Sequence, residues 1–135
     1  MKRYEVLNID DDKITLMLHN IIVKSTKLPL DIKDFESAET TVEYLKAHSG
    51  IEDTFFFIML DINMPGMSGW DFLEYLEGRP EIQCSVAMIT SSIDGRDKEI
   101  ASQHKLVTAF YVKPINREDV IKFFTQGGIF SELQF

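Results

Sequence analysis

The chain has 135 residues, the usual size of one domain, and its 44% hydrophobic and 27% charged residues are ordinary for a soluble globular protein. Its 22 acidic and 14 basic side chains give a formal net charge of -8, which argues against direct binding to nucleic acid or to a membrane surface. No apolar run is long enough to span a membrane, no signal peptide is recognisable, and a single cysteine excludes an internal disulfide. We therefore expect a cytoplasmic protein.

Five short apolar runs, separated by stretches of helical period, predict five strands. They are Tyr4–Ile9, Leu30–Phe35, Phe55–Leu60, Ser85–Thr90 and Thr108–Val112. The last three are almost continuously apolar, which is typical of strands covered on both faces. Strict alternation of strand and helix favours right-handed crossovers and a parallel sheet with helices on both sides. The sequence therefore predicts an α/β protein, a three-layer α/β/α sandwich around a five-stranded parallel sheet.

Most of the intervening stretches carry an apolar stripe at helical spacing that we expect to face the sheet. The stripe of the first helix consists of Ile14, Met17, Leu18, Ile21 and Ile22. Ser37 is predicted to cap the second helix, and Gly78 is predicted to end the third. The segment Asp94–Lys105 has the weakest stripe, and the fifth helix is expected to follow Asn116.

Side chains that could bind a metal ion or take part in a reaction lie at the ends of four of the five strands. Asp10, Asp11 and Asp12 follow the first, Asp61 follows the third, Thr90 ends the fourth, and Lys113 follows the fifth. Because ligands bind beyond the carboxyl ends of the strands in open α/β sheets, we expect these side chains to converge. Carboxylates brought together repel one another unless a cation intervenes, and Mg²⁺ suits a site with two or three carboxylates.

This set of residues suits phosphoryl transfer. A carboxylate can act as the nucleophile and form an aspartyl phosphate, while a metal ion, a lysine and a hydroxyl stabilise charge on the phosphoryl oxygens. The sequence contains neither glycine-rich nucleotide fingerprint. We therefore expect a phosphoryl donor other than ATP bound to this chain.

The same residues resemble the pattern of the response regulator receiver family, CheY-like proteins of two-component signalling, from about residue 2 to residue 126. The matching segments are Val6–Asp12, Met59–Gly69, Met88–Ser91 and Tyr111–Pro114. The stretch from Asp61 to Gly69 alone is specific, and four elements at the proper spacing make coincidence improbable. The resemblance implies a sheet in the flavodoxin-like order 2-1-3-4-5. It also implies a receiver domain over residues 1–126, and we expect the tail 127–135 to carry no output domain.

By this resemblance, Asp61 accepts a phosphoryl group from a phosphohistidine on a sensor histidine kinase or a histidine phosphotransfer protein. Asp11 and Asp61 would hold Mg²⁺ directly, together with the backbone carbonyl of Asn63, and Asp10 would act mainly through coordinated water. Asp12 is not required by the pattern, and we interpret it as the N-cap of the first helix.

The resemblance also assigns the switch. Thr90 and Lys113 would contact the phosphoryl oxygens, and Phe110 matches the aromatic residue that turns inward when the Thr90 hydroxyl moves. The bond between Lys113 and Pro114 is expected to be cis. The switch would change the surface of helix four, strand five and helix five, which controls a downstream protein or a fused output domain. Such a protein is not a turnover enzyme, although it assists its own phosphorylation and dephosphorylation.

Several alternatives stay open at this point. The Asp10–Asp12 run also imitates the start of an aspartate-nucleophile phosphatase of the haloacid-dehalogenase type, although Asp61 would then be unexplained. A degenerate receiver that only docks is disfavoured because every phosphorylation residue is present. The protein could stand alone or be cut from a longer regulator, and homodimerisation through the switch surface is untested. The tail 127–135 could extend the last helix, dock on a partner or be loose.

The remaining candidate ligands have simpler interpretations. We interpret His19, His48 and His104 as surface or boundary residues, because none has acidic or cysteine companions at ligand spacing. Cys84 is expected to be a buried thiol.

Overall fold

The computed structural model describes residues 2–48 and 51–126. Five parallel strands form one sheet in the order β2-β1-β3-β4-β5. Their bounds are β1 Arg3–Ile9, β2 Asp31–Phe35, β3 Thr54–Asp61, β4 Gln83–Thr90 and β5 Val107–Val112. The predicted α/β fold, its strand order and each predicted strand are confirmed, whereas the predicted tail 127–135 lies outside the described residues.

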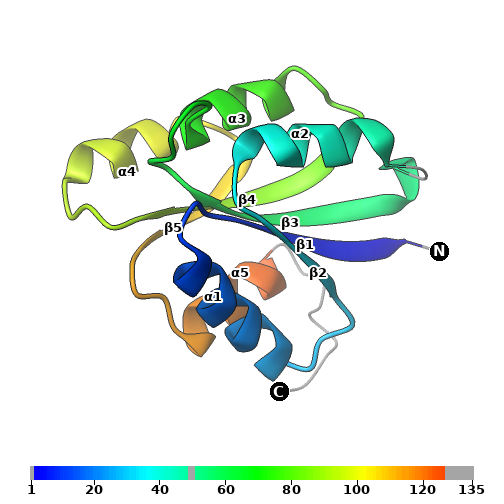
Figure 1. The fold of residues 1–135 in the computed structure, drawn as a ribbon, viewed down its shortest axis with the longest axis horizontal. Helices are drawn as coiled ribbons and strands as arrows, with labels where there is room; N and C mark the ends of the chain where they lie inside the picture. The colour runs from blue at the N-terminus through cyan, green and yellow to red at the C-terminus, as the bar shows by residue number, and fades with distance from the viewer. Residues whose placement is uncertain (1, 49–50, 127–135) are drawn as a thin grey trace.

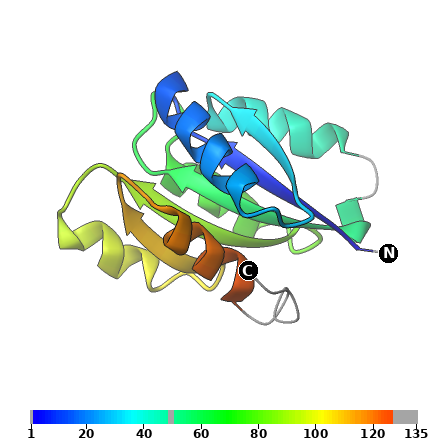
Figure 2. The same ribbon diagram turned by 90° about the horizontal axis from the view of Figure 1, so that it is seen from below.

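Five helices cover the two faces of the sheet. They are α1 Lys13–Ser25, α2 Ala38–Ala47, α3 Gly69–Glu77, α4 Gly95–Ala101 and α5 Arg117–Thr125, and a 3-10 turn spans Ile51–Asp53. Helices α1 and α5 lie on one face, and α2, α3 and α4 lie on the other, so the protein has three layers (Figures 1 and 2). Within the described ranges, no helix has both the length and the apolar character needed to cross a membrane.

The central strand β3 supplies side chains to both halves of the core. Phe56, Ile58 and Leu60 pack with α2 and α3 in the larger apolar cluster. Phe57 and Met59 belong to the second cluster, which contains Phe123 and Phe124 of α5. This alternation places every second side chain on the opposite face, as a pleated strand requires. The near-continuous apolar run in the sequence therefore reflects a strand buried on both sides.

The predicted orientation of α1 is wrong. Ile14, Met17, Leu18 and Ile21 are 66%, 54%, 51% and 58% exposed, and the buried residues of the helix are Leu16, His19 and Val23. Leu16, His19 and Val23 also share one face at helical spacing, so the sequence offers two candidate stripes. His19 is consequently a buried residue and not the surface or boundary residue that we expected.

The beginning of α1 is hydrogen-bonded to the end of β1. The Asp12 side chain caps the helix by accepting hydrogen bonds from the backbone N–H groups of Ile14 and Thr15. The Asp12 N–H in turn donates to the Asp10 carboxylate at the end of β1 over 2.9 Å. The cap is therefore tied to the strand, and Leu16 and His19, four and seven positions after Asp12, are buried.

Helix α4 differs slightly from the prediction, whereas α5 begins where it was predicted. Helix α4 is confined to Gly95–Ala101, a shorter element than the segment Asp94–Lys105, and the apolar residues Ile93 and Ile100 are 90% and 45% exposed. Helix α5 begins after Asn116, which caps it, and ends at Thr125.

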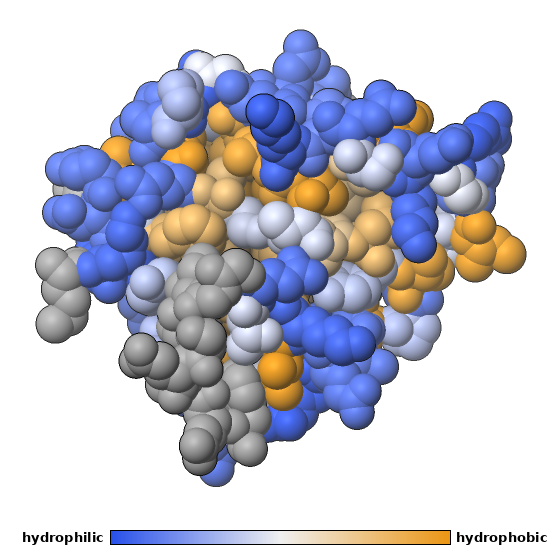
Figure 3. Space-filling view, turned by 180° about the vertical axis from the view of Figure 1, so that it is seen from behind, coloured by the Kyte–Doolittle hydropathy of each residue, from blue (hydrophilic) through white to orange (hydrophobic). Residues whose placement is uncertain are grey.

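Seen from behind, apolar side chains gather across the middle of the molecule, between hydrophilic regions above and below (Figure 3).

Candidate functional site

Three carboxylates meet at the carboxyl edge of the sheet. Asp10 follows β1 and Asp61 is the last residue of β3; these strands are paired, and the partner of Ile9 is Leu60. One carboxylate oxygen from each of Asp10, Asp11 and Asp61 lies within 4.8 Å of the other two. Asp10 and Asp61 are buried and Asp11 is exposed. The pairing of β1 with β3 therefore produces the predicted acidic cluster.

Lys113 provides a positive charge inside this cluster. Its Nζ lies 2.7 Å from Oδ2 of Asp10 and 3.5 Å from Oδ1 of Asp61. Burial by itself would lower the pKa of Lys113, but the hydrogen bond with Asp10 and the charges of Asp10 and Asp61 outweigh burial, so the pKa is raised. Lys113 is therefore charged at neutral pH and partly offsets the two buried carboxylates.

The Asp61 carboxyl group has a perturbed acidity. Burial and, next, the charge of Asp10 raise its pKa from 3.8 to about 6, against the opposing effect of Lys113. The charged form of Asp61 is therefore destabilised, and a cation bound nearby would stabilise it. Asp12 is different, because its exposed carboxylate accepts backbone hydrogen bonds from Ile14 and Thr15 that lower its pKa. Its predicted capping role is confirmed.

Thr90 and Lys113 lie side by side at the ends of β4 and β5. The N–H of Lys113 donates to the carbonyl of Thr90 over 2.8 Å. The Thr90 side chain is fully buried, and its hydroxyl oxygen accepts a hydrogen bond from the N–H of Ser92 over 3.0 Å. The peptide bond between Lys113 and Pro114 is cis, the isomer that the resemblance implies.

Phe110 lies on β5, opposite Met88 of β4, and its side chain is partly buried against the larger apolar cluster. It lines a cavity of about 220 Å³ between β5 and α4, which also includes Lys98, Ala101 and Ser102. The ring therefore has unfilled space beside it.

The loop from Asp61 to Gly69 is held tightly against the sheet. The N–H of Gly69 donates to the carbonyl of Ile62 over 2.9 Å. A Cβ atom on Gly69 would lie 2.5 Å from the carbonyl oxygen of Asp61, closer than any side chain tolerates. Asn63 is exposed in this loop, after Ile62, whose N–H donates to the carbonyl of Ile89. Gly69 ends the specific stretch of the sequence that begins at Asp61, but its steric role against the sheet was not predicted.

Sequence reasoning also missed Glu39 of α2. Its Oε2 accepts a hydrogen bond from the N–H of Met67 over 3.2 Å and lies against Gly66, whose φ is +76°. A Cβ atom on Gly66 would collide with this oxygen. Glu39 therefore fixes the far end of the Asp61 loop, a contact between segments 28 residues apart that no local pattern signals.

The sequence model of the response regulator receiver domain matches residues 6–125, and the chain therefore belongs to this family, the receiver domains of two-component response regulators. This membership leaves the phosphatase alternative without support. No curated protein gives a significant match to the sequence.

Solved structures of response regulators share the fold. The CheY-like receiver domain protein from Methanospirillum hungatei JF-1 is 28% identical, with 92% of this chain and 94% of that chain covered and a TM-score of 0.68. A two-component response regulator from Cytophaga hutchinsonii is 24% identical, with 93% and 97% covered and a TM-score of 0.77. The bacteriophytochrome response regulator AtBRR is 21% identical, with 99% and 98% covered and a TM-score of 0.76.

Proposed function

We propose that Asp61 accepts a phosphoryl group from a phosphohistidine on a sensor histidine kinase or a histidine phosphotransfer protein. The observation that carries this proposal is the position of the Asp61 carboxylate, beside Asp10 and Asp11 and 3.5 Å from the ammonium group of Lys113. Within residues 2–48 and 51–126, Asp10, Asp11 and Asp61 form the one such group of metal-ligating side chains. A phosphoryl group on Asp61 would thus lie beside Asp10, Asp11 and Lys113.

The donor set fits Mg²⁺. Asp10, Asp11 and Asp61 offer oxygen ligands within 4.8 Å of one another, and hard divalent cations prefer such ligands. We propose that Asp11, Asp61 and the carbonyl of Asn63 hold the ion, with Asp10 acting through coordinated water. When bound, the ion would withdraw negative charge from the transferred phosphoryl group.

Each residue of the site would then have its own role in the transfer. An oxygen of Asp61 attacks phosphorus, the bond from phosphorus to the donor imidazole nitrogen breaks, and its electron pair stays on the imidazole. Lys113 is close enough to Asp61 to pair with a phosphoryl oxygen and stabilise the charge that develops. The Thr90 hydroxyl would donate to another phosphoryl oxygen, and its present role as acceptor from Ser92 leaves its own proton available.

Phosphorylation would switch the surface of α4, β5 and α5. Movement of the Thr90 hydroxyl toward Asp61 would free space beside β5, and Phe110 would turn inward. Phe110 has no hydroxyl to desolvate, so its burial carries no polar cost. The cavity of about 220 Å³ beside Phe110 supports this proposal because it gives the ring and α4 room to rearrange. The switched surface would control a downstream protein or a fused output domain.

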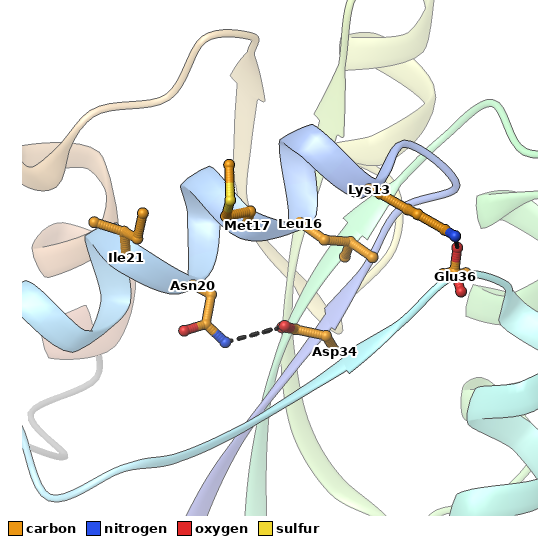
Figure 4. Close-up of a pocket in the computed structure, with 7 residues that line it drawn as sticks. All are labelled: Lys13, Leu16, Met17, Asn20, Ile21, Asp34 and Glu36. Carbon is orange, nitrogen blue, oxygen red and sulfur yellow. Dashed lines mark hydrogen bonds and ion pairs between the residues drawn. The ribbon is translucent and has the colours of Figure 1, made fainter.

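The outer face of α1 supports a protein as the phosphoryl donor. Ile14, Met17, Leu18 and Ile21 are exposed on a helix that begins three residues after Asp10, and residues 14–23 include no Asp, Glu, Lys or Arg. Beside them, a groove is lined by Asn20 and Asp34, which are hydrogen-bonded across it (Figure 4). Exposed apolar surface next to a reactive site is typical of a protein interface.

We further propose that the protein acts in the cytoplasm as a switch and not as a turnover enzyme. Residues 1–126 would form the receiver domain, and no nucleic acid or membrane would be bound directly. Homodimerisation through α4, β5 and α5 is one way in which the switched surface could act.

Incubation of the protein with Mg²⁺ and acetyl phosphate tests the proposal. Intact mass spectrometry should show the addition of one phosphoryl group, which should be absent in Asp61→Asn. The matched control is Asp12→Asn, because asparagine also caps a helix and this carboxylate lies outside the cluster. Phosphorylation that persists in Asp61→Asn, or that disappears only in Asp10→Asn, would overturn the proposal.

A further inference from the structure

The loop segment of residues 63–67 lies between β3 and α3 and forms no helix or strand. On the β3 side, the N–H of Ile62 is hydrogen-bonded to β4 over 3.0 Å. On the α3 side, the N–H of Ser68 donates to the carboxylate of Asp71 over 3.0 Å. Between these two points, the Met64 side chain is buried in the larger apolar cluster. The backbone on either side of Met64 therefore depends on contacts with other parts of the chain.

Glu39 of α2 provides such a contact. Its Oε2 accepts a hydrogen bond from the N–H of Met67 over 3.2 Å. In the part of the chain that the structure describes, this is the one hydrogen bond between residues 63–67 and another helix or strand. The carbonyl of Asn63 accepts no hydrogen bond from a described residue, so its oxygen is available to a cation.

Two local features bring the Glu39 carboxylate to the loop. Glu39 lies in the first turn of α2, after the N-cap Ser37, where the N–H groups of a helix favour a negative charge. Gly66 has φ +76°, a backbone conformation that residues with a side chain rarely adopt, and a Cβ atom there would collide with Oε2 of Glu39. The absence of a Cβ atom thus leaves room for the carboxylate beside the Met67 N–H.

We propose that Glu39 is a positioning residue for the metal site. Its hydrogen bond with Met67 holds residues 63–67 in the conformation from which the Asn63 carbonyl binds Mg²⁺. The inference rests on the proposed function, in which that carbonyl is a ligand, and Glu39 itself contacts neither the ion nor the phosphoryl group. A ligand that the fold holds in place loses little conformational freedom when the ion binds, whereas a mobile ligand loses more and binds less tightly. Helix α2 therefore contributes to Mg²⁺ affinity without supplying a ligand.

Mg²⁺ titrations of the full chain, followed by the NMR shifts of its amides, test this role. In Glu39→Ala, we expect the dissociation constant for Mg²⁺ to rise by roughly three- to tenfold, the factor that corresponds to the loss of one ordinary hydrogen bond. Glu39→Gln keeps an acceptor oxygen but carries no charge, so its affinity should be closer to that of the parent than to that of Glu39→Ala.

The matched control is Glu43→Ala. Glu43 lies one turn further along α2 and is exposed, and replacing it changes the net charge as much as Glu39→Ala does. This control leaves the contact with Met67 in place, so we expect it to bind Mg²⁺ as tightly as the parent.

Hydrogen exchange in EDTA supplies a readout that needs no metal. In Glu39→Ala, we expect the Met67 amide to exchange faster than in the parent and in Glu43→Ala, with β1 and α5 unchanged, because only the loop loses a contact. Faster exchange throughout the sheet would indicate a general loss of stability and would overturn the proposal.

The titration can also overturn it. An unchanged Mg²⁺ affinity in Glu39→Ala would leave the proposed function standing but remove Glu39 from it. Equal losses of affinity in Glu39→Ala and Glu43→Ala, or in Glu39→Ala and Glu39→Gln, would assign the effect to charge and not to the hydrogen bond. Absence of Mg²⁺ binding in the parent protein would overturn the proposed function together with this inference.

Discussion

Lys113 Nζ lies 2.7 Å from Oδ2 of Asp10, although 103 residues separate them in sequence. The contact ties the loop after β5 to the end of β1 across β4 and β3, and β3 is the strand that ends in Asp61. One cation thus serves two buried carboxylates, and its distance of 3.5 Å from Asp61 makes that second contact the weaker one.

Replacement of Lys113 should lower the stability of the protein. In Lys113→Met, the Asp10 and Asp61 carboxylates lose their counter-charge, so we expect the free energy of unfolding to fall by about 1–3 kcal/mol at pH 7 without divalent ions. Mg²⁺ should restore part of the loss because it supplies positive charge at the same place. Urea denaturation with and without Mg²⁺ measures both effects.

The matched control is Lys13→Met. Lys13 lies 3.8 Å from Glu36, and both side chains are well exposed, so its removal should change stability by less than about 1 kcal/mol. Equal effects of the two substitutions would contradict the role given to Lys113.

Asp61 should make the stability of the metal-free protein fall as the pH rises. Its pKa is raised from 3.8 to about 6 on folding, so the folded protein binds this proton more tightly than the unfolded chain does. The free energy of unfolding should therefore decrease between pH 4 and pH 7, by up to about 3 kcal/mol from this group. Asp61→Asn should be more stable than the parent at pH 7 in EDTA, and this advantage should shrink at pH 4. Thermal melts at the two pH values decide, and an advantage that is independent of pH would refute the assignment.

Position 69 should not tolerate a side chain larger than that of glycine. The Cβ of Gly69→Ala would meet the backbone of Asp61 and Ile62 at 2.5 Å and 2.8 Å, so the loop has to shift. We expect a loss of about 1–3 kcal/mol of stability and slower phosphorylation by acetyl phosphate, because the Asp61 backbone moves. Gly95→Ala is the control, since a Cβ there meets nothing within 4 Å and alanine favours the helix. If both variants melt at the temperature of the parent, the packing argument fails.

Activation should change the side of the molecule that contains Phe110. Beryllofluoride with Mg²⁺ imitates the phosphoryl group, and we expect it to alter hydrogen exchange over Thr90–Lys105 and around Phe110. The same treatment of Asp61→Asn should leave exchange unchanged. An unchanged pattern in the parent protein would argue against a working switch.

The exposed face of α1 should affect the rate of phosphotransfer from protein donors and not from acetyl phosphate. Leu18→Lys and Ile21→Lys place charge in the middle of this face, which is more than half exposed, so the fold should tolerate them. We expect phosphotransfer from a cognate histidine kinase or phosphotransfer protein to slow by roughly tenfold or more, whereas acetyl phosphate should react as before. Lys24→Gln, at the far end of the same helix, is the control. Transfer that is equally fast in all variants would place the donor elsewhere.

The sequence by itself determined the sheet and the membership of the site. Continuous apolar runs specify buried parallel strands, and the carboxyl ends of such strands share one edge. The sequence alone therefore predicts that Asp10, Asp61, Thr90 and Lys113 lie close together at that edge. This inference needed only local patterns and one general property of α/β proteins.

The tertiary structure decided what local patterns leave open. Helical spacing shows which residues share a face, but only packing on the sheet shows that α1 buries Leu16 and His19 and exposes Ile14 and Met17. Likewise, the acidity of Asp61 and the need for Gly69 depend on distances of a few ångströms between segments that are remote in sequence. Electrostatic and steric energies change steeply over such distances, and these distances are fixed only when the whole chain has packed.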